Sequence, residues 1–265
     1  MRGVAQPHGA CEIHENRLRY HCMRTSPKPL PSTLLPAPPM PTPSPTARSA
    51  TAGPSPRRTL PRILVTGFEA FGDDPSGQGL NPSASAALAL HGKRICGHRV
   101  VAAVLPCVFG QSIQRLTDLI QQHQPALIVC TGQAGGRAGI SIERIAVNLD
   151  DAPLPDNAGC TLQSQPVVAH GPAAYFSTLP VQAMLGALQR AQLPCELSSS
   201  AGHFVCNHVF YALMHQLATR RSLRTVRGGF IHMPYLPEQA EASGAPSMAQ
   251  ALINHALAVA LKTAF

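Results

Sequence analysis

Short β-branched runs, several of them leading straight into a glycine-rich loop, alternate with helical segments along most of this 265-residue chain. The predicted strands include Arg62–Thr66, Arg99–Leu105, Ala126–Cys130 and Gly229–His232. Strands that alternate with helices predict an α/β domain with a largely parallel sheet. Sites in such sheets gather at the carboxyl ends of the strands, so the loops after Thr66, Cys130 and Ile231 are the first places to look.

Helical segments follow from caps and apolar spacing. Asn81 with Pro82 behind it predicts a helix N-terminus, and the helix runs to about Leu90. Apolar residues at i, i+3 and i+4 predict the others, which are Phe109–His123, Val181–Ala191, Asn207–Thr219 and Met248–Leu261. Two further extended segments are expected. Ile140–Asn148 alternates and can lie at a sheet edge, and Glu196–Ser199 is short.

The composition changes near residue 61. Residues 1–61 hold half of the 26 prolines and a net charge of +6, out of +8 for the whole chain. Proline at this density blocks helices and central strands, so we expect residues 1–61 to be a disordered, proline-rich basic extension. Residues 62–265 are nearly balanced in charge. The basic character therefore gives no reason to expect nucleic acid as a partner.

Other classes are disfavoured by simple patterns. No stretch approaches the roughly 18 apolar residues of a membrane span, so no membrane partner is expected. The eight cysteines lie far apart without a CxxC pair, which argues against a zinc ribbon or a disulfide framework. No apolar segment follows the first arginines, so a secretory signal is not expected.

Cys206 is the first candidate for chemistry. A short extended run precedes it and a helix follows, so its thiol is expected near a helix N-terminus. The helix dipole there favours a thiolate and predicts a lowered pKa, and nearby backbone N–H groups could hold an oxyanion. The alternatives are a buried structural cysteine and a metal ligand in His203-x2-Cys206-x-His208, for which a second ligand pair is missing.

His232 and Glu143 complete a possible constellation. His232 ends a strand and could act as a general base, or could be a packed histidine. Glu143 sits in an otherwise apolar strand, where a carboxylate needs a partner such as a histidine nitrogen. Asp150, Asp151 and Asp156 compete as acids, although their loop suggests turn chemistry. From these residues alone the chain is a possible cysteine hydrolase.

The glycine loop Gly132–Arg137 follows a strand, as a phosphate-binding loop would. It lacks the order of either phosphate-binding motif, so a tight turn is the favoured interpretation. The same loop is one of many ordered motifs between Arg62 and Phe265. The others are LVTGFEAFG (64–72), NPS (81–83), LPCVF (105–109), ISIERIAVN (140–148), PDNAG (155–159), AYFSTLP (174–180), SAGHFVCN (200–207), GFIHMPYLPEQ (229–239) and PSM (246–248).

Through these motifs the chain resembles the pyroglutamyl peptidase I (pyrrolidone-carboxylate peptidase) family of cysteine peptidases, over residues 62–265. The resemblance implies a three-layer open α/β sandwich with a mostly parallel twisted sheet flanked by helices. It implies removal of an N-terminal pyroglutamyl residue from peptides, through an acyl-enzyme. It places the nucleophile on Cys206, the base on His232 and the orienting carboxylate on Glu143. The family is metal-free, needs no cofactor, is typically cytoplasmic and often forms dimers or tetramers.

The substrate explains further residues. Pyroglutamate is a small neutral lactam, so its pocket should be flat-walled and apolar with a few amide-directed hydrogen bonds. Phe68, Phe71 and Phe204 resemble the family's ring-contacting residues, and Asn81 and Gln133 match polar positions of that region. The resemblance also suggests that Arg137 helps to hold the oxyanion site.

The chain departs from the family pattern in places. Asp151-Ala152-Pro153 replaces a common DDAR, so an arginine near the pocket rim is missing, and Cys107 replaces a commoner Thr or Val, which could bring a second thiol near the pocket. Residues 1–61 have no counterpart. Two rival interpretations remain, a binding protein that acts through the proline-rich extension, and another small-amide hydrolase with the same triad.

Overall fold

Seven strands form the central sheet in the computed structural model, which describes residues 60–72 and 79–265. Across the sheet these strands are β2 (Arg94–Ile95), β3 (His98–Leu105), β1 (Arg62–Phe68), β4 (Leu127–Gln133), β9 (Arg227–Met233), β5 (Ile140–Glu143) and β8 (Cys195–Ser198). A separate pair consists of β6 (Ile145–Val147) and β7 (Ala174–Phe176).

Strand direction places the site. The four central strands β3, β1, β4 and β9 run parallel, so their carboxyl ends share one edge of the sheet. β2 is antiparallel to β3, while β5 is antiparallel to β9 and parallel to β8. The mostly parallel α/β sheet that the sequence predicts is therefore confirmed, with reversed strands on both flanks.

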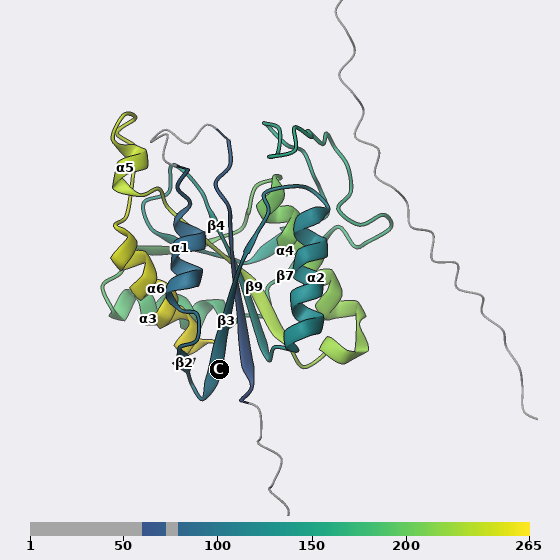
Figure 1. The fold of residues 1–265 in the computed structure, drawn as a ribbon, viewed down its shortest axis with the longest axis horizontal. Helices are drawn as coiled ribbons and strands as arrows, with labels where there is room; N and C mark the ends of the chain where they lie inside the picture. The colour runs from purple at the N-terminus through teal and green to yellow at the C-terminus, as the bar shows by residue number, and fades with distance from the viewer. Residues whose placement is uncertain (1–59, 73–78) are drawn as a thin grey trace, which may run out of the picture. The chain divides into compact units, whose positions relative to one another are not determined.

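Helices cover both faces of the sheet. Figure 1 shows α1, α3 and α6 on one side of the sheet, called the α1 face here, and α2 and α4 on the other, the α4 face. This is the predicted three-layer sandwich. The helices are α1 (Pro82–Ala89), α2 (Gln111–His123), α3 (Val181–Arg190), α4 (Val205–Thr219), α5 (Pro237–Ala240) and α6 (Gln250–Thr263), with a 3-10 turn η1 at Arg221–Leu223. None of the described helices is both long and apolar enough to cross a membrane.

Alternation along the strands divides the core in two. Ile63 and Val65 of β1 belong to the apolar cluster on the α1 face of the sheet, whereas Leu64 and Phe68 of the same strand belong to the cluster on the α4 face. Because both faces of the sheet are buried, the central strands are mainly apolar, as parallel strands in such folds usually are. Cys206 lies in the α4-face cluster.

The register brings three positions of the proposed site side by side. Thr66 of β1 pairs with Cys130 of β4, so Phe68, two residues beyond Thr66, lies level with Gly132, two residues beyond Cys130. Gly132 pairs with His232 on β9, and His232 pairs with Ser141 on β5. This row crosses the carboxyl end of the parallel strands, which is the edge where the sequence places a site.

The prediction of one strand over Ile140–Asn148 is wrong. The chain breaks at the exposed Arg144, and β5 lies inside the sheet between β9 and β8 instead of at an edge. The second half leaves to pair with β7, because the carbonyl of Arg144 accepts from the Ser177 N–H at 2.8 Å. The Asn207 side chain then binds both backbone groups of Val147 and holds β6 against α4.

Other elements differ at their ends. α4 begins at Val205, two residues before the prediction, because Phe204 is extended (φ −98°, ψ −167°) and acts as its N-cap. α2 begins at Gln111 and not at Phe109, since Phe109 N–H is held by Asp156 Oδ2 at 2.9 Å. The capped start of α1 at Asn81 is confirmed. The predicted disorder of residues 1–61 lies, except for residues 60 and 61, outside the described residues.

Gly67 allows α1 to approach the sheet. A Cβ at this position would collide with the backbone of Ser83 and Ala84 in the first turn of α1. We therefore expect Gly67→Ala to lower the free energy of unfolding by about 1–3 kcal/mol or more, because backbone atoms cannot move aside as a side chain can. Urea unfolding followed by circular dichroism measures the change.

Gly186→Ala is the matched control. Gly186 lies inside α3, and its added Cβ meets only the end of the Arg190 side chain, at 3.3 Å. Alanine favours a helix over glycine by up to about 1 kcal/mol, so this variant should be as stable as the parent or more stable. Equal stability of Gly67→Ala and the parent would contradict the close approach described here.

Candidate active site

Cys206 lies in the first turn of α4. The first intrahelical bond there runs from His208 N–H to Phe204 O at 3.1 Å. The N–H groups of Val205, Cys206 and Asn207 therefore have no acceptor within the helix, as at any helix N-terminus. This placement puts a thiol beside free backbone donors, as the sequence predicts.

Gly132 brings the thiol onto the sheet. A Cβ at Gly132 would stand 2.7 Å from Cys206 Sγ and 3.0 Å from the ring of Phe230. The missing side chain therefore makes the space that the sulfur occupies. His232 is the direct partner of Gly132 on the neighbouring strand, so the thiol and the imidazole are neighbours above the carboxyl end of the sheet.

Glu143 and His232 are hydrogen-bonded. His232 Nδ1 lies 2.8 Å from Glu143 Oε1, and both side chains are almost completely buried. The same oxygen accepts a hydrogen bond from Arg137 Nη1, also at 2.8 Å. A carboxylate oxygen that already accepts from a guanidinium acts as an acceptor, so Nδ1 carries the proton and Nε2 of a neutral His232 is left with its lone pair.

Arg137 joins three segments of the site. Its Nη1 binds Glu143, and its Nη2 donates to the carbonyl of Ser200 at 3.0 Å, in the run that leads into α4. A second carboxylate, Glu196, is farther away at 4.0 Å and is 59% exposed. Arg137 thus binds the carboxylate and the loop before Cys206, and its support of an oxyanion site stays a prediction.

Burial governs the ionisation of the pair. Desolvation raises the pKa of the Cys206 thiol well above its ordinary 9.0, and the neighbouring Cys107 and Glu143 raise it further, while Arg137 opposes them. The predicted lowering of this pKa is therefore wrong, because burial of the thiol favours its neutral form. Desolvation also lowers the pKa of His232 below 6.5, against the opposing effect of Glu143.

A pocket of about 630 Å³ opens over these groups. Cys206 and His232 line it together with the glycine loop after β4. Apolar walls come from Phe71, Phe204 and Leu154. Phe71 and Phe204 pack against each other with ring centroids 5.7 Å apart. A neutral flat group of small size fits such a wall, beside a thiol and a neutral imidazole.

Comparison with known proteins identifies the family. A sequence model described as pyroglutamyl peptidase matches residues 61–265. The chain belongs to the pyroglutamyl peptidase family. This membership confirms the family that the motifs predict and makes the chain an enzyme, a hydrolase of the cysteine-peptidase class.

Individual relatives agree with this result. A pyrrolidone-carboxylate peptidase of Cupriavidus taiwanensis is 50% identical over 206 residues, which are 77% of this chain and 93% of that protein. Another from Streptomyces coelicolor is 47% identical over 205 residues, 77% of this chain and 92% of the other.

Solved structures match equally well. Pyroglutamyl peptidase I of Bacillus amyloliquefaciens superposes with a TM-score of 0.73 at 40% identity, over 77% of this chain and 96% of that one. A mutant pyrrolidone carboxyl peptidase of Pyrococcus furiosus gives 0.72 at 39% identity, over 77% and 97%. These matches confirm the predicted fold class.

The residues predicted to bind substrate fall into two groups. Phe71, Phe204 and Gln133 line the pocket, and Gln133 Oε1 accepts from Gln239 Nε2 at 2.9 Å. Phe68 and Asn81 lie outside this lining. Phe68 is in the core beside Phe230, and Asn81 caps α1 by accepting from Ser83 N–H. Their contact with substrate stays a prediction.

Two larger side chains of the pocket are not predicted as site residues from the sequence. Tyr235 and Leu154 line the pocket, the first after β9 and the second in the loop after β6. Tyr235 lies three residues after His232, just beyond the carboxyl end of β9, so this position in the strand order could have predicted it as a pocket residue. No local sequence pattern predicts Leu154, because its loop reaches the pocket only through tertiary contacts. Pro153, at the place where the resemblance leads one to expect an arginine, also lines the pocket.

The remaining candidates have structural surroundings. His208 Nδ1 binds Asp150 Oδ2 at 2.7 Å, and its Nε2 accepts from Gly110 N–H. Within residues 60–72 and 79–265 no three His, Cys, Asp or Glu side chains are grouped to hold a metal. Cys107 is buried in the same cluster as Cys206, and burial raises its pKa to about 12.

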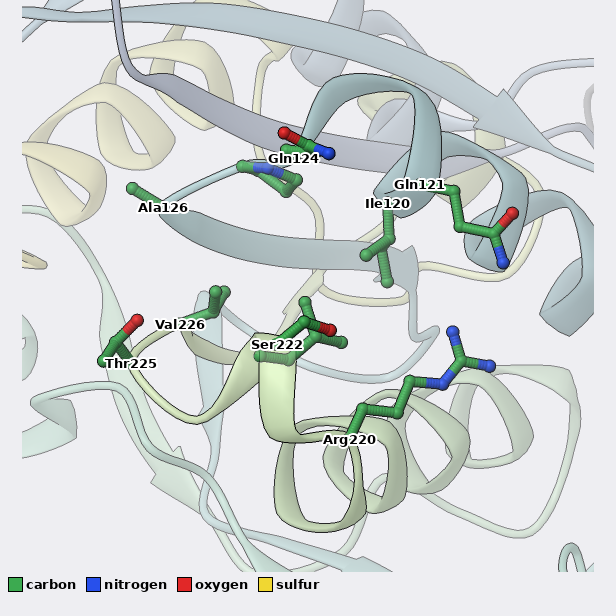
Figure 2. A pocket seen from close by; sticks show the side chains of 10 residues that line it. Ile120, Gln121, Gln124, Ala126, Arg220, Ser222, Thr225 and Val226 are labelled. Carbon is green, nitrogen blue, oxygen red and sulfur yellow. The ribbon is translucent and has the colours of Figure 1, made fainter. Parts of the chain in front are cut away.

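A second hollow lies at the other edge of the sheet. It measures about 600 Å³, and Figure 2 shows it between the end of α2 and the turn that follows α4. Ile120, Gln124, Arg220 and Val226 are among its walls. The segment before β4 borders it, so it faces the amino ends of the parallel strands, and none of the predicted site residues contributes to it.

The raised pKa of Cys206 predicts slow, pH-dependent alkylation. Between pH 6 and 9 the reaction of iodoacetamide with Cys206 should accelerate about tenfold per pH unit, because only the thiolate reacts. Mass spectrometry of the peptide that contains Cys206 measures the rate, with the exposed Cys96 of the same sample as internal reference. A rate that is already constant above pH 6 would mean that a thiolate is present at neutral pH.

Proposed function

We propose that this enzyme hydrolyses the amide bond after an N-terminal pyroglutamyl residue of a peptide, with Cys206 as nucleophile, His232 as general base and Glu143 as the group that orients His232. The observation that supports it most is the buried hydrogen bond between His232 Nδ1 and Glu143 Oε1, beside a thiol that rests on Gly132. The names of the relatives agree with this substrate.

The ionisation states determine the first step. Both the thiol and the imidazole are neutral at pH 7, since the pKa of Cys206 is raised and that of His232 is lowered. His232 Nε2 therefore takes the Sγ proton as sulfur attacks the pyroglutamyl carbonyl carbon. Glu143 stabilises the imidazolium that forms, because its Oε1 accepts a hydrogen bond from Nδ1–H throughout.

The later steps use the helix N-terminus and the same imidazole. The tetrahedral oxyanion is held by backbone N–H groups at the start of α4, which lack acceptors in the helix. The imidazolium gives its proton to the leaving amine as the C–N bond breaks, and a thioester on Cys206 remains. Water then attacks the thioester while His232 takes a proton, which releases pyroglutamate and restores the thiol.

The pocket supports a small neutral acyl group. The aromatic pair of Phe71 and Phe204 offers a flat wall for the lactam ring, and the glycine loop offers backbone amide groups. We also propose that Phe68, Asn81 and Gln133 assist as the family resemblance implies. Asn81 would assist indirectly, because its Nδ2 donates to the carbonyl of Glu69 at 2.9 Å, close in sequence to the pocket residue Phe71. A homo-oligomer, dimer or tetramer, and a cytoplasmic location stay predictions.

Amide cleavage by a Cys206 variant tests the function. We expect a fluorogenic pyroglutamyl amide to be cleaved by the full chain, and Cys206→Ala to lower kcat/KM by at least about a thousandfold with an unchanged circular dichroism spectrum. Cys96→Ala is the control, because this exposed cysteine does not line the pocket. Robust turnover by Cys206→Ala would refute the assignment.

Substrate analogues test the acyl specificity. Prolyl and glutaminyl amides should be cleaved much more slowly than the pyroglutamyl amide, since proline lacks the lactam carbonyl and glutamine lacks the ring. A site that hydrogen-bonds a group can reject an analogue without it by up to about 10⁴-fold. Comparable kcat/KM values for all three amides would indicate a different small-amide hydrolase.

A further inference from the structure

Arg137 contacts the acid of the proposed triad and the loop that carries its nucleophile. Its Nη1 donates to Glu143 Oε1 and its Nη2 to the carbonyl of Ser200, six residues before Cys206. Glu143 is completely buried, and the Arg137 side chain is only 20% exposed. An arginine with only a surface role would not bind both the buried Glu143 carboxylate and the backbone that leads to Cys206.

The two donors share one carboxylate oxygen. Arg137 Nη1 and His232 Nδ1 both lie 2.8 Å from Glu143 Oε1, whereas the buried Oε2 has no hydrogen-bond partner among the described residues. The guanidinium is therefore a close neighbour of the imidazole, and the position of one oxygen decides the position of both. Removing the charge of Arg137 therefore changes the electrostatic potential at His232 strongly, because little water lies between the two groups to screen it.

We propose that Arg137 is a positioning residue of the hydrolytic reaction, which keeps His232 uncharged in the resting enzyme by neutralising Glu143 and holds the Cys206 loop at the carboxylate. This inference rests on the proposed function. It assigns Arg137 two separable roles, one through its charge and one through its second hydrogen bond.

The charge role follows from the groups that face His232. They are Glu143 from β5, Arg137 from the loop after β4 and Cys206 from α4, with the exposed Glu196 behind Arg137. Glu143 favours an imidazolium and Arg137 disfavours it, and the two effects act against each other on the pKa of His232. Without the guanidinium, Glu143 would draw a proton onto His232 at a higher pH, and a protonated imidazole cannot accept the thiol proton.

The positioning role follows from the second bond. The run from Ser198 to Phe204 carries the chain from β8 to the start of α4, and Arg137 binds its carbonyl at Ser200. This bond sets the distance between the carboxylate on β5 and the first turn of α4. A small displacement of a reacting group costs a large factor in rate, so the bond should matter for kcat more than for substrate binding.

Two substitutions separate the roles. Arg137→Gln removes the charge, and Arg137→Lys keeps the charge but cannot supply both donors in the same fork. Arg144→Gln is the matched control, because Arg144 is exposed, lies next to Glu143 in sequence and has no ion pair with a described residue. All variants are measured for kcat and KM from pH 4.5 to 9 on the pyroglutamyl amide, after circular dichroism has shown that they fold.

The expected profiles differ in shape. The acid limb of kcat/KM should move up by about one pH unit in Arg137→Gln and stay in place in Arg137→Lys and Arg144→Gln. Arg137→Lys should lose at least about tenfold in kcat with little change in KM. An unmoved acid limb in Arg137→Gln would overturn the charge role, and wild-type kcat in Arg137→Lys would overturn the positioning role.

NMR titration keeps the test independent of activity. The His232 imidazole signal, assigned by its loss in His232→Gln, should titrate at higher pH in Arg137→Gln than in the parent enzyme. If the parent cleaves no pyroglutamyl amide, the proposed function fails, while this titration still decides the charge role. If Arg137→Gln does not fold, the acid limb and kcat of Arg137→Lys decide the proposal, since a displaced limb or an unchanged kcat would each contradict it.

Discussion

A carboxylate buried inside a sheet is the constraint on which the rest of this structure depends. Removing an ionised group from water costs several kcal/mol unless charge and hydrogen bonds compensate. Glu143 obtains both at one oxygen, from Arg137 and from His232. To deliver these two donors, the glycine loop after β4 and the end of β9 must both converge on β5. The reversed direction of β5 places its last residue within the sheet, where that convergence is possible.

The same burial explains why the site holds neutral partners at rest. A thiolate–imidazolium pair needs water or a strong field to stabilise it, whereas only 7% of Cys206 and 2% of His232 is exposed. The charges that do exist, on Glu143 and Arg137, are adjacent and compensate each other. The proposed chemistry therefore separates charge only when substrate is present, when the helix N-terminus can share it.

Much of this arrangement was predictable from the sequence, and the exceptions share a cause. The parallel strands, the capped start at Asn81 and the meeting of Cys206, His232 and Glu143 near the strand ends follow from local patterns and chain order. The division of Ile140–Asn148 into two strands does not follow from the sequence, because the local pattern around Arg144 is that of a continuous strand. The division depends on hydrogen bonds from the distant residues Ser177 and Asn207. The pKa of Cys206 was misjudged for the same reason, since the dipole is local and desolvation depends on the whole fold.

The order of the strands in the sheet limits when the proposed site can form during synthesis of the chain. β9 is the last strand in the sequence, but it lies between β4 and β5 in the middle of the sheet, and its His232 is separated from Glu143 by 89 residues. Contacts at this separation form late, because a long loop must close first. A nascent chain that has emerged only as far as Cys206 therefore has the proposed nucleophile but not yet the proposed base, His232, which lies on the last strand. On the proposed mechanism, the hydrolytic chemistry therefore becomes possible only once β9 has joined the sheet.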